Sequence, residues 1–315
     1  MPVTQQTQSS TRPSASAHLS WHRMLRLGAL GLASDIRDRY RDPALRKRPL
    51  AQALIPRLDH AIFIVGAPRS GTTFLGGCIG RLPEVSYHFE PRLTKAAAQH
   101  VYDESWGKSR SAVVFRLSYS ALLVATLDGG RRFADKNPEN SFLIPFLATV
   151  FPNAQFVHIV RDGRDAAVSH AEKPWLAAAS AGSGQRGRAR QPYGPHPRWW
   201  VEPDRSAEFA TVPDIVRTAW CWRRFTEAAL EGLAALPAGR TVEVRYEDVV
   251  GDPMTAAQTL GEFLGTSAAG LDALRTGLSR ARPDSIGRWR KILRQSEIVE
   301  VEKEIGPLLS LLGYS

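Results

Sequence analysis

The chain has 315 residues, of which 43% are apolar and 23% charged, so it can bury one large core, and it has no apolar run of the roughly 18 residues that a membrane span needs. Its cysteines, Cys78 and Cys221, fit no metal-ligand or CxxC spacing, which excludes a disulfide framework and favours a reducing, cytoplasmic setting. The net charge of +10 suits an anionic partner, but the basic residues form no long arm, which favours a local anion site over nucleic acid.

The N-terminal part is expected to lie outside the main domain. Residues 1–20 are rich in Ser, Thr and Gln, which predicts a disordered tail. Residues 21–59 are interpreted as a helical extension. Within it, residues 21–41 could form a basic amphipathic helix that makes peripheral contact with a membrane; an organellar presequence and a helix packed on the domain are the alternatives.

Residues 60–315 are interpreted as one domain in which short β-rich runs alternate with helical patterns. The runs cover residues 62–65, 85–89, 131–134, 155–160 and 242–245. This alternation predicts an α/β fold with three layers, a parallel sheet between two layers of helices. Ligands of such sheets bind beyond the carboxyl ends of the strands. The residues that follow the runs are therefore candidate site residues: the loop 66–73, Glu90, Lys136, Arg161 and Tyr246.

Three features complete the predicted domain. Residues 177–205 are rich in Gly, Ser, Pro and Arg, which indicates a long loop of the kind that forms a lid. Pro213 is expected to open a helix whose aromatic residues, Trp220, Trp222 and Phe225, face the core. A last helix is expected over residues 297–312, stopped by Gly313.

The segment 62–73 predicts a buried strand, a glycine-rich turn and the start of a helix. Free amides at such a helix start form an anion site, and Gly66 and Gly71 let the backbone close around a phosphate. The Gly-x4-Gly spacing matches an NTPase P-loop, but Thr72 replaces the lysine, which disfavours triphosphate hydrolysis. A turn without a ligand is the alternative. The candidate anion-binding residues are Pro68, Arg69, Ser70, Gly71, Thr72 and Thr73.

A second strand-turn-helix element covers residues 156–169. Arg161 ends its strand and Ser169 lies about two turns into its helix, so a guanidinium and a hydroxyl could clamp one phosphate. The alternative is a surface turn in which Arg161 pairs with Asp162 or Asp165.

Together these motifs resemble those of PAPS-dependent sulfotransferases, in a style similar to bacterial, carbohydrate and tyrosylprotein members. These enzymes transfer a sulfuryl group from 3′-phosphoadenylyl sulfate (PAPS) and release adenosine 3′,5′-bisphosphate. The resemblance implies a P-loop nucleotide-kinase-like fold, with the loop 66–73 at the 5′-phosphosulfate and Arg161 with Ser169 at the 3′-phosphate. It continues through residues 135–138, 245–248 and 285–291. There it implies further donor contacts by Tyr246, Ser285 and Arg288, although a plain loop serine is an equal reading of Ser285.

Sulfuryl transfer needs a cation at the leaving oxygen and a base for the acceptor proton. By resemblance Lys136 is the expected cation and Glu90 the expected base, with His88 as the rival base. The structural alternatives are a helix-capping or salt-bridging role of Glu90 beside Arg92, and a salt bridge of Lys136 with Asp135 or Glu139. His170 is interpreted as a packed helix residue.

The predicted function is therefore sulfuryl transfer from PAPS to a hydroxyl of a small-molecule, carbohydrate, lipid or tyrosine acceptor, with no metal. A P-loop kinase or NTPase and a catalytically inactive nucleotide-binding protein are the alternatives. The sequence specifies neither the acceptor nor the oligomeric state.

Overall fold

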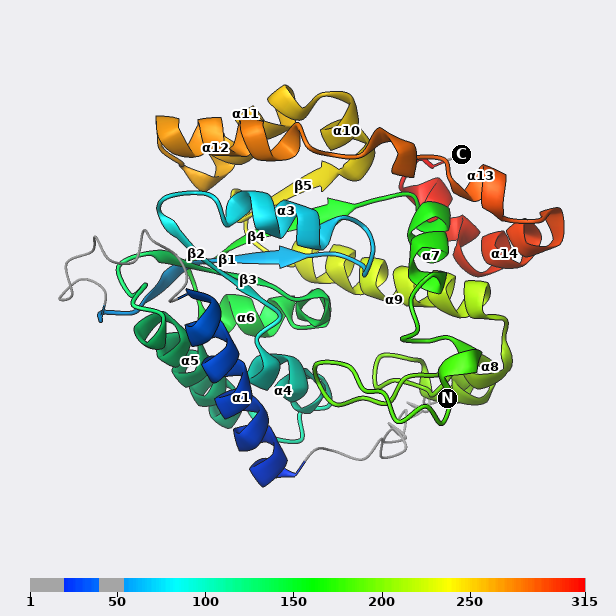
Figure 1. Ribbon diagram of the computed structural model, residues 1–315, viewed down its shortest axis with the longest axis horizontal. Helices are drawn as coiled ribbons and strands as arrows, with labels where there is room; N and C mark the ends of the chain where they lie inside the picture. The colour runs from blue at the N-terminus through cyan, green and yellow to red at the C-terminus, as the bar shows by residue number, and fades with distance from the viewer. Residues whose placement is uncertain (1–19, 40–53, 315) are drawn as a thin grey trace, which may run out of the picture.

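The computed structural model describes residues 20–39 and 54–314. Five parallel strands form one sheet in the order β2-β3-β1-β4-β5, so the predicted parallel sheet is confirmed (Figure 1). Most of the predicted tail lies outside the described residues. The strands are β1 (Arg57–Val65), β2 (Val85–Phe89), β3 (Arg132–Lys136), β4 (Gln155–Val160) and β5 (Thr241–Arg245).

Three strands differ from their predicted bounds. β1 begins at Arg57 rather than at residue 62, β3 covers Arg132–Lys136 rather than residues 131–134, and β5 begins at Thr241 rather than at residue 242. The apolar pattern stops at Ala134, but β3 pairs with β1 and β2 on its two sides, and Lys136 lies opposite both Ile64 and Phe89. Lys136 is therefore held by the sheet itself, which no hydrophobic pattern indicates.

Helices cover both faces of the sheet (Figure 1). One face packs against α3 (Thr72–Ile79), α11 (Pro253–Leu264) and α12 (Ala268–Leu278). The other face packs against α4 (Arg92–Tyr102), α5 (Lys108–Ala125), η2 (Pro138–Phe142), α6 (Ile144–Val150) and part of α9 (Asp214–Ala234). The remaining elements are α1 (Trp21–Arg39), α7 (Gly163–Ala171), η3 (Ala178–Ser180), η4 (Pro203–Arg205), α8 (Ser206–Thr211), α10 (Tyr246–Gly251), η5 (Pro283–Ser285), α13 (Trp289–Ile292) and α14 (Gln295–Leu311).

The aromatic residues predicted for the core of α9 are buried, with Trp220, Trp222 and Phe225 at most 2% exposed. They belong to a cluster that joins α7, α9 and α14. α14 ends where Gly313 takes a φ of 72°, as the sequence predicts. Burial of these rings fixes α7, and with it the chain that follows β4.

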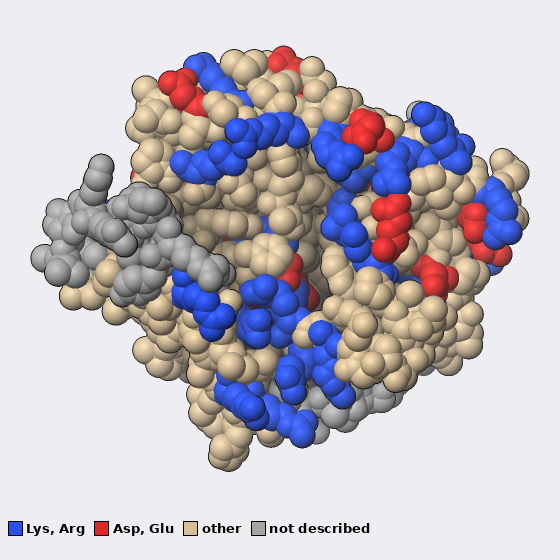
Figure 2. Space-filling view, viewed as in Figure 1, with Lys and Arg blue, Asp and Glu red and all other residues tan. Residues whose placement is uncertain are grey.

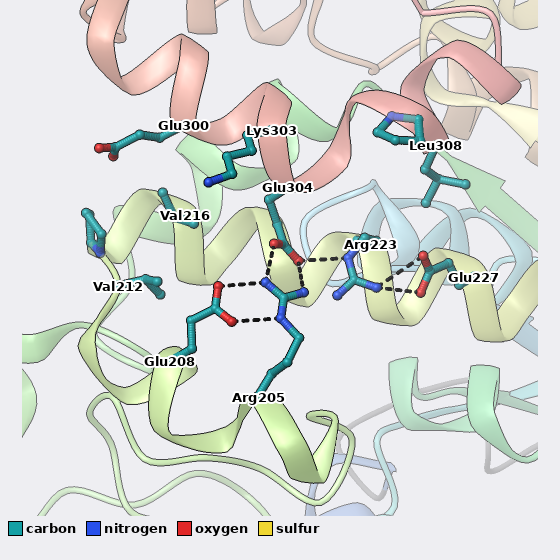
Figure 3. Close-up of a pocket in the computed structure, with 12 residues that line it drawn as sticks. Arg205, Glu208, Val212, Val216, Arg223, Glu227, Glu300, Lys303, Glu304 and Leu308 are labelled. Carbon is teal, nitrogen blue, oxygen red and sulfur yellow. Dashed lines mark hydrogen bonds and ion pairs between the residues drawn. The ribbon is translucent and has the colours of Figure 1, made fainter.

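Ion pairs also fasten α14 to α9 around a cavity of about 480 Å³ (Figure 3). Glu304 accepts from Arg223 at 2.8 Å and from Arg205 at 2.9 Å, while Glu208 pairs with Arg205 and Glu227 with Arg223. Because these charges neutralise one another, we assign this cavity a structural role.

α1 packs on α4 and α5 through Met24 and Leu27, which are buried near Leu93. Trp21, Leu25 and Leu30 of the same helix are exposed, although the ring of Trp21 also packs edge-to-face on that of Trp106. None of the helices over residues 20–39 and 54–314 is long and apolar enough to span a membrane. Contact of α1 with a membrane surface remains a prediction.

The packing of Trp222 on α7 leaves no space for a side chain at Gly163. A Cβ there would lie 2.6 Å from Cε3 of Trp222. We expect Gly163→Ala to lower the free energy of unfolding by about 1–3 kcal/mol, the usual cost of overpacking, as measured by urea denaturation. Gly251→Ala is the control, because a Cβ there meets no atom within 4 Å. Equal stability of the two variants would contradict the packing argument.

Candidate active site

The carboxyl ends of all five strands meet at one edge of the sheet because the strands are parallel. The loop 66–73 follows β1, Glu90 follows β2, Arg161 follows β4, and Tyr246 follows β5. Lys136 is the last residue of β3. The structure thus brings these five predicted elements of the site to one edge.

The loop 66–71 curves tightly between β1 and α3. Gly66, Arg69 and Gly71 all have positive φ angles, of 136°, 70° and 99°. A Cβ on Gly66 would lie 2.4 Å from the carbonyl oxygen of Ile159, so the loop requires glycine there. Ser70 is fully buried, yet its Oγ makes no hydrogen bond to the described part of the chain. A curved loop with an unsatisfied buried hydroxyl fits an anion held at the start of α3.

Arg161 lies beside this loop and is only 5% exposed. It pairs with neither Asp162 nor Asp165: it donates to the backbone carbonyls of Arg69, at 3.2 Å, and Ser285. Its guanidinium lies 4.7 Å from the centre of the Tyr246 ring, and its buried Nε makes no hydrogen bond to the described residues. Carbonyls carry no net charge, so this buried cation lacks a counter-ion in residues 20–39 and 54–314.

Other site residues surround Arg161. Ser169 Oγ accepts from Arg69 Nε at 3.1 Å, and burial together with Arg161 lowers the pKa of Arg69. Ser285 Oγ lies 2.9 Å from the hydroxyl of Tyr246. Arg69, Arg161, Ser169, Tyr246 and Ser285 therefore form one connected group.

Asp165 holds the C-terminal segment against this group. Its carboxylate accepts from the backbone amides of Gly287, at 2.6 Å, and Trp289, at 3.0 Å. Arg288 lies between them in sequence but points to Glu172, with which it forms a 2.5 Å ion pair at the surface. Ser285 therefore lies in the group around Arg161, whereas Arg288 lies in a salt bridge at the surface.

Glu90 and Lys136 form an ion pair at the other end of the edge. Lys136 Nζ lies 2.7 Å from Glu90 Oε1, and Lys95 Nζ of α4 lies 3.1 Å from Glu90 Oε2 and 2.6 Å from Glu139 Oε2. The carboxylate thus binds two lysines, neither of which is among the partners considered from sequence. Burial raises the pKa of Glu90, but Lys95 and Lys136 outweigh it and lower the pKa to about 2. Burial lowers the pKa of Lys136, against the effect of Glu90.

A cavity of about 450 Å³ connects the loop 66–73 with this ion pair. Figure 2 shows Lys and Arg side chains gathered around a central hollow on this face. Among the predicted residues, the cavity is lined by Pro68, Arg69, Thr72, Thr73, Glu90 and Lys136, whereas Arg161, Ser169, Tyr246 and Ser285 lie outside its lining. The rival His88 is also outside: it hydrogen-bonds to Ser86 and stacks on Phe133.

Sequence reasoning missed several residues of the cavity wall. Lys95 lies in the first turn of the helix after Glu90, so extending the strand-end rule by one turn would have found it. Arg188 and Arg198 come from the predicted lid, where no periodicity marks individual residues. His170 is a buried helix residue, as predicted, and also lines the cavity; burial and the neighbouring Arg69 and Arg198 lower its pKa to about 3.

Comparison with known proteins agrees with this geometry. Residues 61–269 match the sulfotransferase family, and the chain therefore belongs to that family. Carbohydrate sulfotransferase 5 of Mus musculus is 29% identical over 191 residues, which cover 55% of this chain and 44% of that protein. Protein-tyrosine sulfotransferase A of Caenorhabditis elegans is 30% identical over 121 residues, which cover 34% of this chain and 32% of that protein. The chain thus spans less than half the length of either relative.

A solved structure supports the fold. A sulfotransferase from Mycobacterium tuberculosis superposes with a TM-score of 0.51 at 14% identity, over 92% of this chain and 88% of that one. The predicted sulfotransferase fold is confirmed. In residues 20–39 and 54–314 the structure contains no group of three or more His, Cys, Asp or Glu that could hold a metal ion.

The buried Asp135 provides a test of the electrostatics beneath the site. Burial raises its pKa to about 7, against hydrogen bonds from Asn140 and Tyr119; Glu90 raises it further and Lys136 lowers it. The ordinary pKa is about 3.9, so the folded state holds the proton more tightly and the free energy of unfolding falls as pH rises through this window. Relative to Asp135→Asn, we expect the wild type to lose about 1 kcal/mol per pH unit between pH 5 and 7, measured by urea unfolding.

The matched control is Asp272→Asn, because the side chain of Asp272 is 74% exposed. Its stability should stay at a constant offset from the wild type over the same range. If the free energies of unfolding of the wild type and Asp135→Asn change in parallel from pH 5 to 7, Asp135 is ionised throughout that range.

Proposed function

We propose that this protein is a PAPS-dependent sulfotransferase that acts on a hydroxyl group. The observation that carries the proposal is the buried Arg161, which has no carboxylate partner among the described residues and lies beside an anion-binding loop. An uncompensated buried guanidinium is costly unless an anion binds it. PAPS carries anionic groups at both its 5′ and its 3′ positions, and so supplies one anion for the loop and one for Arg161.

In this proposal the two ends of the donor bind different parts of the edge. The amides of the loop and the hydroxyls of Ser70, Thr72 and Thr73 hold the 5′-phosphosulfate. Arg161 and Ser169 hold the 3′-phosphate through charge-assisted hydrogen bonds. Tyr246 packs against Gly71, where a Cβ would lie 2.8 Å from its ring, and so supports the loop. Ser285 closes the site through Tyr246.

The ion pair at the other end of the cavity supplies the groups that the reaction needs. The acceptor oxygen attacks sulfur as its proton passes to Glu90, and the bond from sulfur to the bridging oxygen breaks. Lys136 neutralises the charge that develops on this oxygen, and adenosine 3′,5′-bisphosphate leaves. A carboxylate whose pKa is about 2 is a weak base. When Lys136 turns to the donor, Glu90 loses one of its two cations, and its pKa rises toward that of an effective base.

The acceptor site and the domain bounds follow from the same geometry. The cavity extends from the loop 66–73 to residues of the loop 177–205. We propose that the loop 177–205 is the lid of a domain that covers residues 60–315. The two named relatives are a carbohydrate and a protein-tyrosine sulfotransferase, which supports a sugar or phenolic hydroxyl as acceptor.

Binding of the donor product tests this assignment. At 100 times its Kd, adenosine 3′,5′-bisphosphate should stabilise the folded protein by about 2.7 kcal/mol and so raise the thermal midpoint. ADP or ATP at the same concentration should raise the midpoint less. Arg161→Ala should weaken binding of the bisphosphate about 10- to 100-fold, as expected for lost hydrogen bonds to a charged group. Arg294→Ala is the control, since the side chain of Arg294 is 80% exposed. Stronger stabilisation by ATP would instead favour a P-loop kinase.

Glu90→Gln tests the proposed base. We expect sulfate transfer from PAPS to fall about 10²- to 10⁴-fold, the usual contribution of a general base, while the affinity for adenosine 3′,5′-bisphosphate changes little. Transfer is measured with radiolabelled donor and affinity by calorimetry. Glu84→Gln is the control, because Glu84 lies before β2, at the opposite edge of the sheet, and does not line the cavity. A fully active Glu90→Gln would exclude Glu90 as the base, and an inactive one that no longer binds the bisphosphate would point to misfolding.

A further inference from the structure

The lid places two arginines in the cavity wall, Arg188 and Arg198. In the described residues the structure gives neither of them a carboxylate partner, although other buried cations of this protein have one. Lys95 pairs with Glu90 and Glu139, and Arg223 pairs with Glu202, Glu227 and Glu304. Arg188 and Arg198 thus share with Arg161 the lack of a carboxylate partner among the described residues.

Arg188 lies at the tip of a hairpin turn. The amide of Gly187 donates to the carbonyl of Gln191 at 2.9 Å, and Arg186 bridges to Pro192. This turn extends the guanidinium of Arg188 to 5.0 Å from the centre of the Phe89 ring, where Nη2 donates to the carbonyl of Phe89 at 3.3 Å. Its Nε is buried and makes no hydrogen bond to the described residues. The charge is thus held against Phe89, at the end of β2, without a carboxylate partner in the described residues.

Arg198, within the lid, contacts both the lid and the chain just before it. Its Nη2 donates to the carbonyls of Pro192, at 2.7 Å, and Trp175, at 3.1 Å. Burial lowers its pKa to about 10. Trp175 in turn packs edge-to-face on His170, with 5.4 Å between the ring centres. Since these carbonyl partners carry no net charge, an anion entering the cavity would gain from both arginines.

Arg188 lies on the acceptor side of the site, and Arg198 lines the same cavity near His170 of α7. Arg188 contacts the end of β2, whereas the loop and Arg161 follow β1 and β4, and β3 separates β2 from β1 in the sheet. The lining contains five Lys and Arg side chains and only two carboxylates, Glu90 and Glu139, both of which bind lysine. Of the five cations, Arg69 belongs to the loop that we propose for the donor and donates to Ser169, and Lys136 faces the leaving oxygen in our proposed function. Lys95 is neutralised, which leaves the two lid arginines for the acceptor.

We propose that the acceptor carries an anionic group beside the ring that bears its reactive hydroxyl, and that Arg188 and Arg198 bind this group. The ring itself packs against two aromatic side chains that line the same cavity, Trp175 just before the lid and Tyr193 within it. A cavity of about 450 Å³ suits an acceptor portion of one sugar or aryl ring. This inference rests on the proposed function, because it names the substrate class of that site.

Two acceptors that differ only at C6 of the sugar, a carboxylate in one and a hydroxymethyl group in the other, test the inference. With saturating PAPS, 4-nitrophenyl β-D-glucuronide should be sulfated with a kcat/KM at least about tenfold above that of 4-nitrophenyl β-D-glucoside, the effect of one or two charge-assisted hydrogen bonds. Arg188→Gln should remove most of this preference. Arg190→Gln is the matched control, because it makes the same change at an exposed residue of the same turn and should keep the preference. Arg198→Lys retains the positive charge at this position and should keep part of the preference for the glucuronide.

If neither glycoside is sulfated, the binding of the corresponding methyl glycosides tests the inference instead. Methyl β-D-glucuronide should stabilise the protein saturated with adenosine 3′,5′-bisphosphate, and methyl β-D-glucoside should not. Equal behaviour of the charged and neutral compounds, or a preference that persists in Arg188→Gln, would overturn the inference. So would a tenfold weaker affinity of Arg188→Gln for adenosine 3′,5′-bisphosphate, which would assign the arginine to the donor. Failure of the proposed function is distinct, because the wild type would then not bind the bisphosphate at all.

Discussion

The ion pair between Lys136 and Glu90 joins the last residue of β3 to the first residue beyond β2. It exists only because the two strands are in register, with Phe89 opposite Lys136 and the amide of Glu90 donating to the carbonyl of Lys136 at 3.0 Å. A slip of one residue would turn Lys136 to the other face of the sheet and separate the pair. The position of the lid depends on it as well, since the ring of Phe89 lies 4.3 Å from Lys136 Nζ and 5.0 Å from the guanidinium of Arg188.

Two arginines only three residues apart show how this protein uses buried positive charge. Arg164 binds both oxygens of Asp162 and stacks on Trp289, so its charge is neutralised within the fold. Arg161 receives only carbonyl partners and a tyrosine ring. Because Arg164 occupies the carboxylate of Asp162, that carboxylate does not neutralise Arg161. The cavity shows the same contrast: Lys95 is neutralised by Glu90 and Glu139, whereas Arg188 donates to a carbonyl.

The sequence predicted the architecture well because strand and helix periodicities and the strand-end rule are local signals. It predicted where the loop 66–73, Glu90, Arg161 and Tyr246 would lie, since each directly follows an apolar run. It did not predict that Glu90 would bind two lysines, because Lys95 comes from a helix whose packing depends on the whole domain. Nor could it single out Arg188 and Arg198, because their positions depend on how an irregular loop folds back over Phe89.

The carboxylate of Asp165 links α7 to residues 287–289 through two backbone amides, while Arg161 contacts the carbonyl of Ser285. The surroundings of Arg161 thus combine a loop near residue 70 with a segment more than 200 residues further along the chain. During synthesis on the ribosome, the first four strands can pair long before this segment leaves the exit tunnel. A nascent chain therefore completes the surroundings of Arg161 only near the end of translation, which separates the time at which the sheet forms from the time at which this pocket can bind an anion.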